Sequence, residues 1–138
     1  MLVAESHDGV FYAAGTHPMS AAEEPMATVD QLVALARHPK FVGIGESGLD
    51  YHYTADSAEV QKVSLRLHIT AAQETGLPLI IHARAADDDM ARILAEGMAE
   101  GGREGARHAL RAFWERVSDG ARYSPIQRTL FDRLLGSW

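Results

Sequence analysis

The sequence predicts an α/β protein in which about three parallel strands alternate with helices, followed by a helical C-terminal segment. Two observations lead to this prediction. Short apolar runs without polar alternation recur along the first part of the chain, as in strands buried on both faces of a parallel sheet. Helical segments separate these runs, and each strand–helix unit takes roughly 30 residues or slightly more, which is typical of right-handed crossover connections.

Local signals predict the three strands and the helix that lies between the first two. Within residues 28–36, Thr28 and Gln31 form the T-x-x-Q pattern of a capping box, which predicts the start of a helix. The apolar residues that follow the box support this helix. The three apolar runs that we expect to form strands are residues 10–16, 41–45 and 79–81.

The remaining elements are predicted to be helical. A long helix over residues 57–75 is expected to end at Gly76, a good C′ residue, and Pro78 blocks its continuation. Its inward stripe is expected to consist of Val60, Val63, Leu67 and Ala71. After residue 81, helices are expected over 87–97, over 103–117 and in a short last segment from Ser124 towards Leu135.

Bulk composition excludes several classes of protein. The 138 residues suit one ordinary domain, and the absence of cysteine excludes disulfides and cysteine-ligated zinc. A net charge of -6 gives no reason to expect tight, non-specific binding of nucleic acid, so nucleic-acid chemistry would need a local site such as a metal ion. No apolar run approaches the roughly 20 residues of a membrane helix, and there is no leader pattern, so a cytoplasmic protein without a membrane partner is expected.

Polar groups follow each of the three predicted strands. His17, Glu46 and His82 occupy these positions, with Arg84 two residues after His82. Because the carboxyl ends of parallel strands gather at one edge of a sheet, two imidazoles and a carboxylate there are a plausible ligand set for a divalent metal. A cation would also remove the cost of burying Glu46, which follows an apolar run.

Each of these residues also has a structural interpretation. A histidine at a strand end is often only hydrogen-bonded, and Glu46 could cap a turn at Gly48 or pair with Arg84. Three consecutive carboxylates, residues 87–89, more simply serve as helix cap and dipole partners than as a metal cluster. The other histidines have no partners at ligand spacing and are expected to be solvated: His7, His38, His52, His68 and His108.

The segments GTHP, GESGLDY and LPLIIHAR resemble the TatD family of metal-dependent deoxyribonucleases over about residues 6–94. The resemblance implies a (β/α)8 barrel that hydrolyses DNA phosphodiesters with one or two divalent ions, Mg, Mn or Zn. It implies that Glu46 and His82 are metal ligands, and that His17 and Arg84 line the substrate phosphate site. Asp50 and Tyr51 match the loop that supports the glutamate.

Compared with that family, the chain lacks an opening strand with an H-x-H pair and the later histidine and aspartate. The fold class expected is therefore a partial barrel of about three parallel strands, weak or inactive alone, with self-association possible through open sheet edges. No residue is an obvious base that activates water, so the catalytic group is left unassigned.

Residues 95–138 resemble a helical segment of patatin-like phospholipases, which predicts two parts, 1–94 and 95–138. Two further functions stay open: a non-catalytic truncated or fused product that acts as an interaction module, and a lipid acyl hydrolase fragment. For the lipid acyl hydrolase function, the chain lacks the G-x-S-x-G motif of a serine nucleophile.

Overall fold

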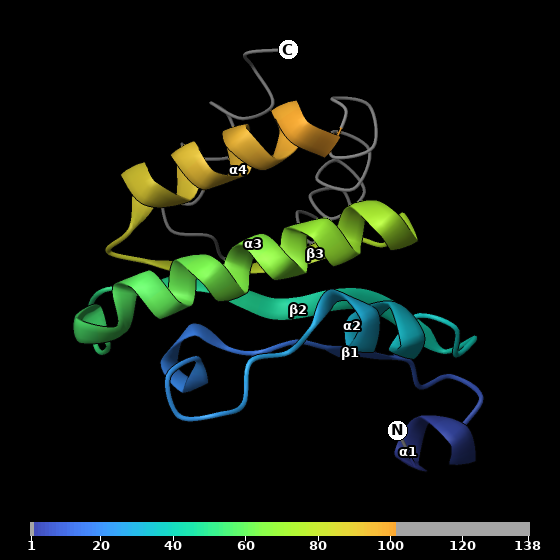
Figure 1. Ribbon diagram of the computed structural model, residues 1–138. Coiled ribbons are helices and arrows are strands. Elements are labelled where there is room, and N and C mark those ends of the chain that lie inside the picture. The colour runs from blue at the N-terminus through green and yellow to red at the C-terminus, as the bar shows by residue number, and fades with distance from the viewer. Residues whose placement is uncertain (1, 102–138) are drawn as a thin grey trace.

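The computed structural model describes residues 2–101, and its elements alternate between strands and helices (Figure 1). The order is α1 (Leu2–Ser6), β1 (Tyr12–Ala14), η1 (Pro18–Ser20), α2 (Val29–Leu35), β2 (Phe41–Asp50), η2 (Ala55–Ser57), α3 (Ala58–Thr75), β3 (Leu79–Arg84) and α4 (Asp87–Gly101). The predicted helices over 103–117 and beyond Ser124 lie outside the described residues.

The three strands form one parallel sheet in the order β1-β2-β3, which confirms the predicted α/β class. In Figure 1, α3 runs between α2 and α4, and its contacts with β2 bring the long helix onto the central strand. The apolar core lies between the sheet and the helices α3 and α4. It includes Ile44, Leu49, Leu65 and Ile93, which are fully buried. The outer edges of β1 and β3 pair with no other strand among residues 2–101.

The predicted start of α2 and the predicted end of α3 are confirmed. Thr28 accepts a hydrogen bond from the Gln31 amide, and the Gln31 side chain accepts one from the Thr28 amide, so the predicted capping box forms. Gly76 ends α3 in the left-handed conformation at φ 68°. Within the described residues, no helix combines the length and apolar character needed to cross a bilayer.

The predicted boundaries of the three strands differ from those in the structure. β1 is shorter than expected, whereas β2 continues to Asp50 and β3 continues to Arg84. Glu46 and His82 therefore lie within strands and not after them. The β2–β3 ladder shifts register between Ile44 and Ser47, so β2 has one residue more than β3 there. Such a bulge lets a polar residue interrupt a buried strand without ending it.

The predicted buried face of α3 was wrong in its first half. Val60 and Val63 are 36% and 52% exposed, whereas Ala71 is buried as expected. Three polar side chains of the same helix are also buried: Gln61, Ser64 and His68. Apolar periodicity does not identify a face on which Gln61 and His68 are buried by hydrogen bonds to distant segments, to Thr54 and Thr16 respectively. His68 was expected to be solvated, and its relative exposure is 0%.

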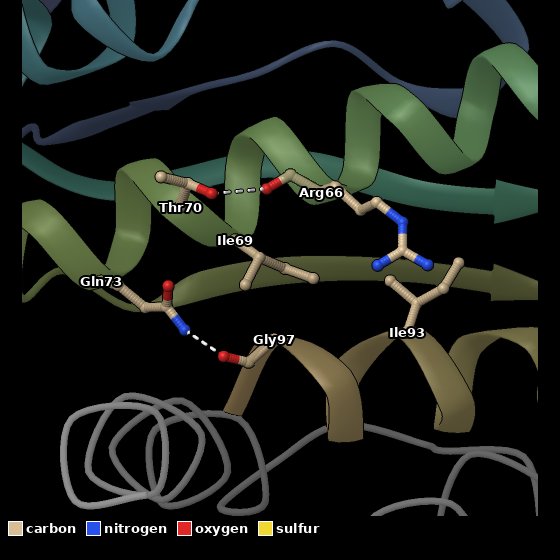
Figure 2. A pocket seen from close by; sticks show the side chains of 6 residues that line it. All are labelled: Arg66, Ile69, Thr70, Gln73, Ile93 and Gly97. Atoms are coloured by element: carbon tan, nitrogen blue, oxygen red, sulfur yellow. Dashed lines mark hydrogen bonds between the residues drawn. The ribbon is translucent and has the colours of Figure 1, made fainter. Parts of the chain in front are cut away.

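Helix α4 packs closely on α3 at Gly97 (Figure 2). A Cβ atom at Gly97 would lie 2.8 Å from Cγ2 of Ile69, so the absence of a side chain allows the helices to approach. Gln73 donates a hydrogen bond of 2.6 Å to the Gly97 carbonyl. The helix was expected to end at Gly97, but it continues to Gly101. The division of the chain at residue 94 stays a prediction.

Candidate metal centre

His17, Glu46 and His82 come together at the sheet, each from a different strand or the segment that follows it. Each residue offers one ligand atom, and these atoms all lie within 4.8 Å of one another. His17 Nε2 is 3.2 Å from His82 Nδ1, and Glu46 Oε1 is 3.1 Å from the same nitrogen. The convergence predicted from the three strands is therefore present in the fold.

Glu46 is not the buried carboxylate that the sequence indicated. Its side chain is 45% exposed, because the bulge in β2 turns it out of a strand whose neighbouring residues are buried. Neither alternative for Glu46 holds: Gly48 lies within β2 and not in a turn, and Glu46 forms no ion pair with Arg84. The exposed carboxylate faces the two imidazoles instead.

The buried carboxylate is Asp50, and it orients His82. Asp50 has a relative exposure of 0%, and its Oδ2 lies 3.0 Å from His82 Nε2. Burial by itself raises the pKa of the Asp50 carboxyl. The hydrogen bonds that it accepts, foremost from the Tyr53 amide and from His82, outweigh burial and hold the pKa below its usual value.

This arrangement determines the tautomer of His82. An ionised carboxylate only accepts, so in a neutral ring His82 Nε2 carries the proton and donates a hydrogen bond to Asp50, which leaves a lone pair on Nδ1. That lone pair faces Glu46 Oε1 at 3.1 Å. Two electron-pair donors so close repel each other unless a proton or a metal ion lies between them. A carboxylate, a histidine and a cation in line are a common arrangement at metal sites.

His17 is oriented differently. Its Nδ1 accepts a hydrogen bond from the Met19 amide in η1, at 3.2 Å. In a neutral ring Nε2 must then carry the proton. This N–H points towards His82 Nδ1 and lies 3.8 Å from Glu46 Oε1. In this tautomer His17 is a hydrogen-bond donor, whereas His82 and Glu46 present electron pairs.

Arg84 does not join the cluster. Its guanidinium carbon lies 4.7 Å from the centroid of the Tyr53 ring, which is itself 60% exposed. The turn that carries Tyr53 is held by Asp50, whose Oδ1 accepts hydrogen bonds from the His52 and Tyr53 amides. Asp50 thus fixes both His82 and the segment on which Arg84 stacks.

Glycines allow the strands to come this close. A Cβ at Gly43 would lie 3.1 Å from Ile80 Cδ1, and one at Gly45 would lie within 3.0 Å of the Ile80 carbonyl oxygen. A Cβ at Gly15 would lie within 3.0 Å of the Gly45 backbone. The absence of side chains at these three glycines therefore lets the neighbouring strands approach closely.

The acidic run at the start of α4 belongs to a different network. Asp89 accepts hydrogen bonds from the Tyr51 hydroxyl at 2.7 Å and from Arg92, and it pairs with Lys62 at 3.2 Å. These partners, Tyr51 foremost, lower the pKa of the Asp89 carboxyl, and burial raises the pKa of Tyr51 to about 12. The three carboxylates lie in the first turn of α4, the position expected of dipole partners, and their capping role stays a prediction.

Comparison with known proteins places this geometry in a family. A family model described as "TatD related DNase" matches residues 1–124. The chain belongs to the TatD-related DNase family. The TatD match extends past the expected boundary at residue 94.

Three relatives illustrate the likeness. The metal-dependent hydrolase YabD of Bacillus subtilis strain 168 is 42% identical over 103 residues, which are 72% of this chain and 39% of YabD. The "3'-5' ssDNA/RNA exonuclease TatD" of Klebsiella pneumoniae strain 342 is 29% identical, covering 67% of this chain and 35% of that protein. The crystal structure of YJJV, a TatD homologue of Escherichia coli K12, superposes with a TM-score of 0.69 at 26% identity.

The alignment with YJJV covers 96% of this chain and 47% of YJJV. The chain thus spans less than half the length of these TatD relatives. Its architecture is that of part of a TatD-type (β/α)8 barrel, as the resemblance implied.

Asp50→Asn is expected to weaken divalent-metal binding by about 10- to 100-fold while the fold is kept. The amide oxygen of asparagine can still accept from the Tyr53 amide, and its NH2 group then faces His82 Nε2. His82 would have to accept at Nε2 and carry its proton on Nδ1, the atom that faces Glu46. Calorimetric titration with Mn²⁺ measures the affinity.

Asp56→Asn is the matched control for that titration, because Asp56 is an exposed carboxylate in η2 and the same change removes the same charge. Equal affinity in Asp50→Asn and Asp56→Asn would contradict the role of Asp50 in orienting His82. Ring ¹⁵N shifts of His82 report the tautomer directly.

Sequence reasoning missed two residues that organise this centre. Asp50 was assigned to the support of Glu46, and the structure places it against His82. Gln61 received no role, yet its buried side chain accepts from the Asp50 amide at 2.8 Å and donates to the Thr54 carbonyl at 2.7 Å. A polar residue on the long helix gives no local sign of such a contact, so no signal in the sequence could have found it.

Proposed function

We propose that this chain provides part of the active site of a metal-dependent hydrolase that cleaves phosphodiester bonds of nucleic acid. The observation that carries the proposal is the approach of Glu46 Oε1 to the lone pair of His82 Nδ1 at 3.1 Å, with His82 held by buried Asp50. Imidazole nitrogen and carboxylate oxygen fit a divalent metal ion. Glu46 and His82 would hold it, and Mg²⁺, Mn²⁺ and Zn²⁺ remain candidates.

His17 and Arg84 are proposed to face the substrate phosphate. In its described tautomer, His17 offers an N–H within 3.8 Å of Glu46 Oε1, where a phosphate oxygen could accept it. Arg84 is exposed and carries a permanent positive charge. The Arg84 charge would offset part of the net charge of -6 locally. A divalent ion held beside them supplies Lewis-acid polarisation of a phosphoryl oxygen.

Nucleic acid is the proposed substrate because a relative carries the name of a single-stranded DNA/RNA exonuclease. DNA was the substrate implied by the resemblance, and the relative's name extends the proposal to RNA. The chain covers 35% of that relative, so the activity of the chain alone is expected to be weak. Self-association of two copies through the open edges of β1 or β3 is also proposed.

Removal of the metal tests this proposal. With protein in excess over a labelled single-stranded oligonucleotide, we expect shortening in Mn²⁺ and none after EDTA treatment, and readdition of Mn²⁺ should restore it. Excess protein lets a weak activity be observed within one turnover. No shortening under any metal, or equal shortening with EDTA, would overturn the catalytic proposal and favour the second candidate, a non-catalytic interaction module.

A further inference from the structure

His68 on α3 makes a hydrogen bond at each nitrogen of a fully buried ring. Its Nδ1 lies 2.7 Å from the Ser64 carbonyl, one turn earlier on α3, and its Nε2 accepts from the Thr16 amide at 2.9 Å. Because a carbonyl only accepts, Nδ1 carries the proton and Nε2 is free to accept. Burial lowers the pKa of His68, which agrees with a neutral ring. The tautomer is therefore fixed by the helix itself.

The bond to Thr16 reaches the segment that carries His17. β1 ends at Ala14, so the β1–β2 ladder no longer holds the backbone at Thr16. Thr16 is 6% exposed, and its amide would be a buried donor without a partner if His68 did not accept from it. The next residue is His17, whose ring is held on its other side by the Met19 amide.

We propose that His68 is a positioning residue: by accepting from the Thr16 amide it fixes the backbone at His17 and so aims the His17 N–H into the shared site. The proposal rests on the proposed function only for the statement that His17 meets a substrate phosphate. The link from helix to strand end spans 52 positions of sequence and connects the outer helix layer to the site. His68 touches no ligand atom of the centre; it acts through Thr16.

Two variants whose new side chains are similar in length separate the positioning role of His68 from simple filling of the core. His68→Gln keeps an acceptor at the position of Nε2, whereas His68→Met has a similar shape and no comparable acceptor. Both variants lose the N–H group that donates to the Ser64 carbonyl, so this loss affects the two variants equally. Leu65→Met, a volume-conserving change at a fully buried position of the same helix, is the control for altered packing.

The first readout is independent of catalysis. In wild type and His68→Gln we expect slow hydrogen exchange at the Thr16 amide and an unchanged ring ¹⁵N pattern for His17, with Nδ1 accepting and Nε2 protonated. In His68→Met we expect exchange at Thr16 to become at least about tenfold faster and the His17 pattern to change, while the His82 pattern stays. An unchanged Thr16 exchange rate and an unchanged His17 ring pattern in His68→Met would overturn the proposal. Changes of equal size in His68→Met and His68→Gln would overturn it as well.

The second readout uses the oligonucleotide assay. kcat/KM is expected to fall by about tenfold or more in His68→Met and to be largely restored in His68→Gln, because small displacements of a binding group are costly. If wild type has no activity, the proposed function fails, and the exchange and ring signals still decide the role of His68. If His68→Met does not fold, the scalar coupling across the Thr16 N–H···Nε2 bond in wild type decides: its absence overturns the proposal, and its presence with an intact His68→Gln supports it.

Discussion

Glu46→Gln is expected to reduce Mn²⁺ affinity and oligonucleotide cleavage by on the order of 100-fold or more. The amide is neutral, so it cannot balance a dication, and its NH2 group can donate to the lone pair of His82 Nδ1 that Glu46 now faces at 3.1 Å. Because the Glu46 side chain is 45% exposed, the free energy of unfolding should change by no more than about 0.5 kcal/mol. Calorimetric titration and the single-turnover assay measure the two losses.

Glu74→Gln provides the matched control for Glu46→Gln. Glu74 is an exposed carboxylate on α3, outside the centre, and the same change removes the same charge. Its affinity for Mn²⁺ and its cleavage rate should equal those of wild type. If both variants cleave at the wild-type rate, the observed nuclease does not use Glu46, and the proposed centre is wrong.

Gly48→Ala is expected to lower the free energy of unfolding by about 3 kcal/mol or more. Gly48 pairs with His82 in the β2–β3 ladder, and its φ of +154° is one that residues with a Cβ rarely adopt. A Cβ there would lie closer than 3.0 Å to the His82 carbonyl oxygen. That oxygen is backbone, so relief of the clash requires the strands to separate next to the proposed metal ligand. Urea denaturation measures the loss.

Gly9→Ala serves as the comparison for that experiment, because a Cβ at Gly9 would have no neighbour within 4 Å. We expect it to change the free energy of unfolding by at most about 0.5 kcal/mol. Wild-type stability in Gly48→Ala would contradict the register that pairs Gly48 with His82.

The sequence predicted the parts of this molecule that depend on local signals. The capping box at Thr28 and the helix end at Gly76 are set by residues close in sequence, and both form. The three strands were located from apolar runs, and parallel strands bring His17, Glu46 and His82 to one place. These inferences needed only periodicity, cap chemistry and the topology of parallel sheets.

The features that the sequence did not reveal depend on long-range contacts. The β2 bulge that exposes Glu46 depends on pairing with β3, and buried Asp50 is bonded to His82, 32 positions later. His68 looked solvated because its partner, Thr16, belongs to a different element. A polar side chain is buried when a distant partner satisfies it, and a single sequence does not name that partner.

Anomalous diffraction from crystals soaked in Mn²⁺ locates any ion held between Glu46 and His82. We expect a peak at bonding distance, about 2.0–2.6 Å, from a Glu46 carboxylate oxygen and from His82 Nδ1, with His82 Nε2 still bonded to Asp50. A peak elsewhere, or no peak at saturating Mn²⁺ with the two side chains still 3.1 Å apart, would contradict it.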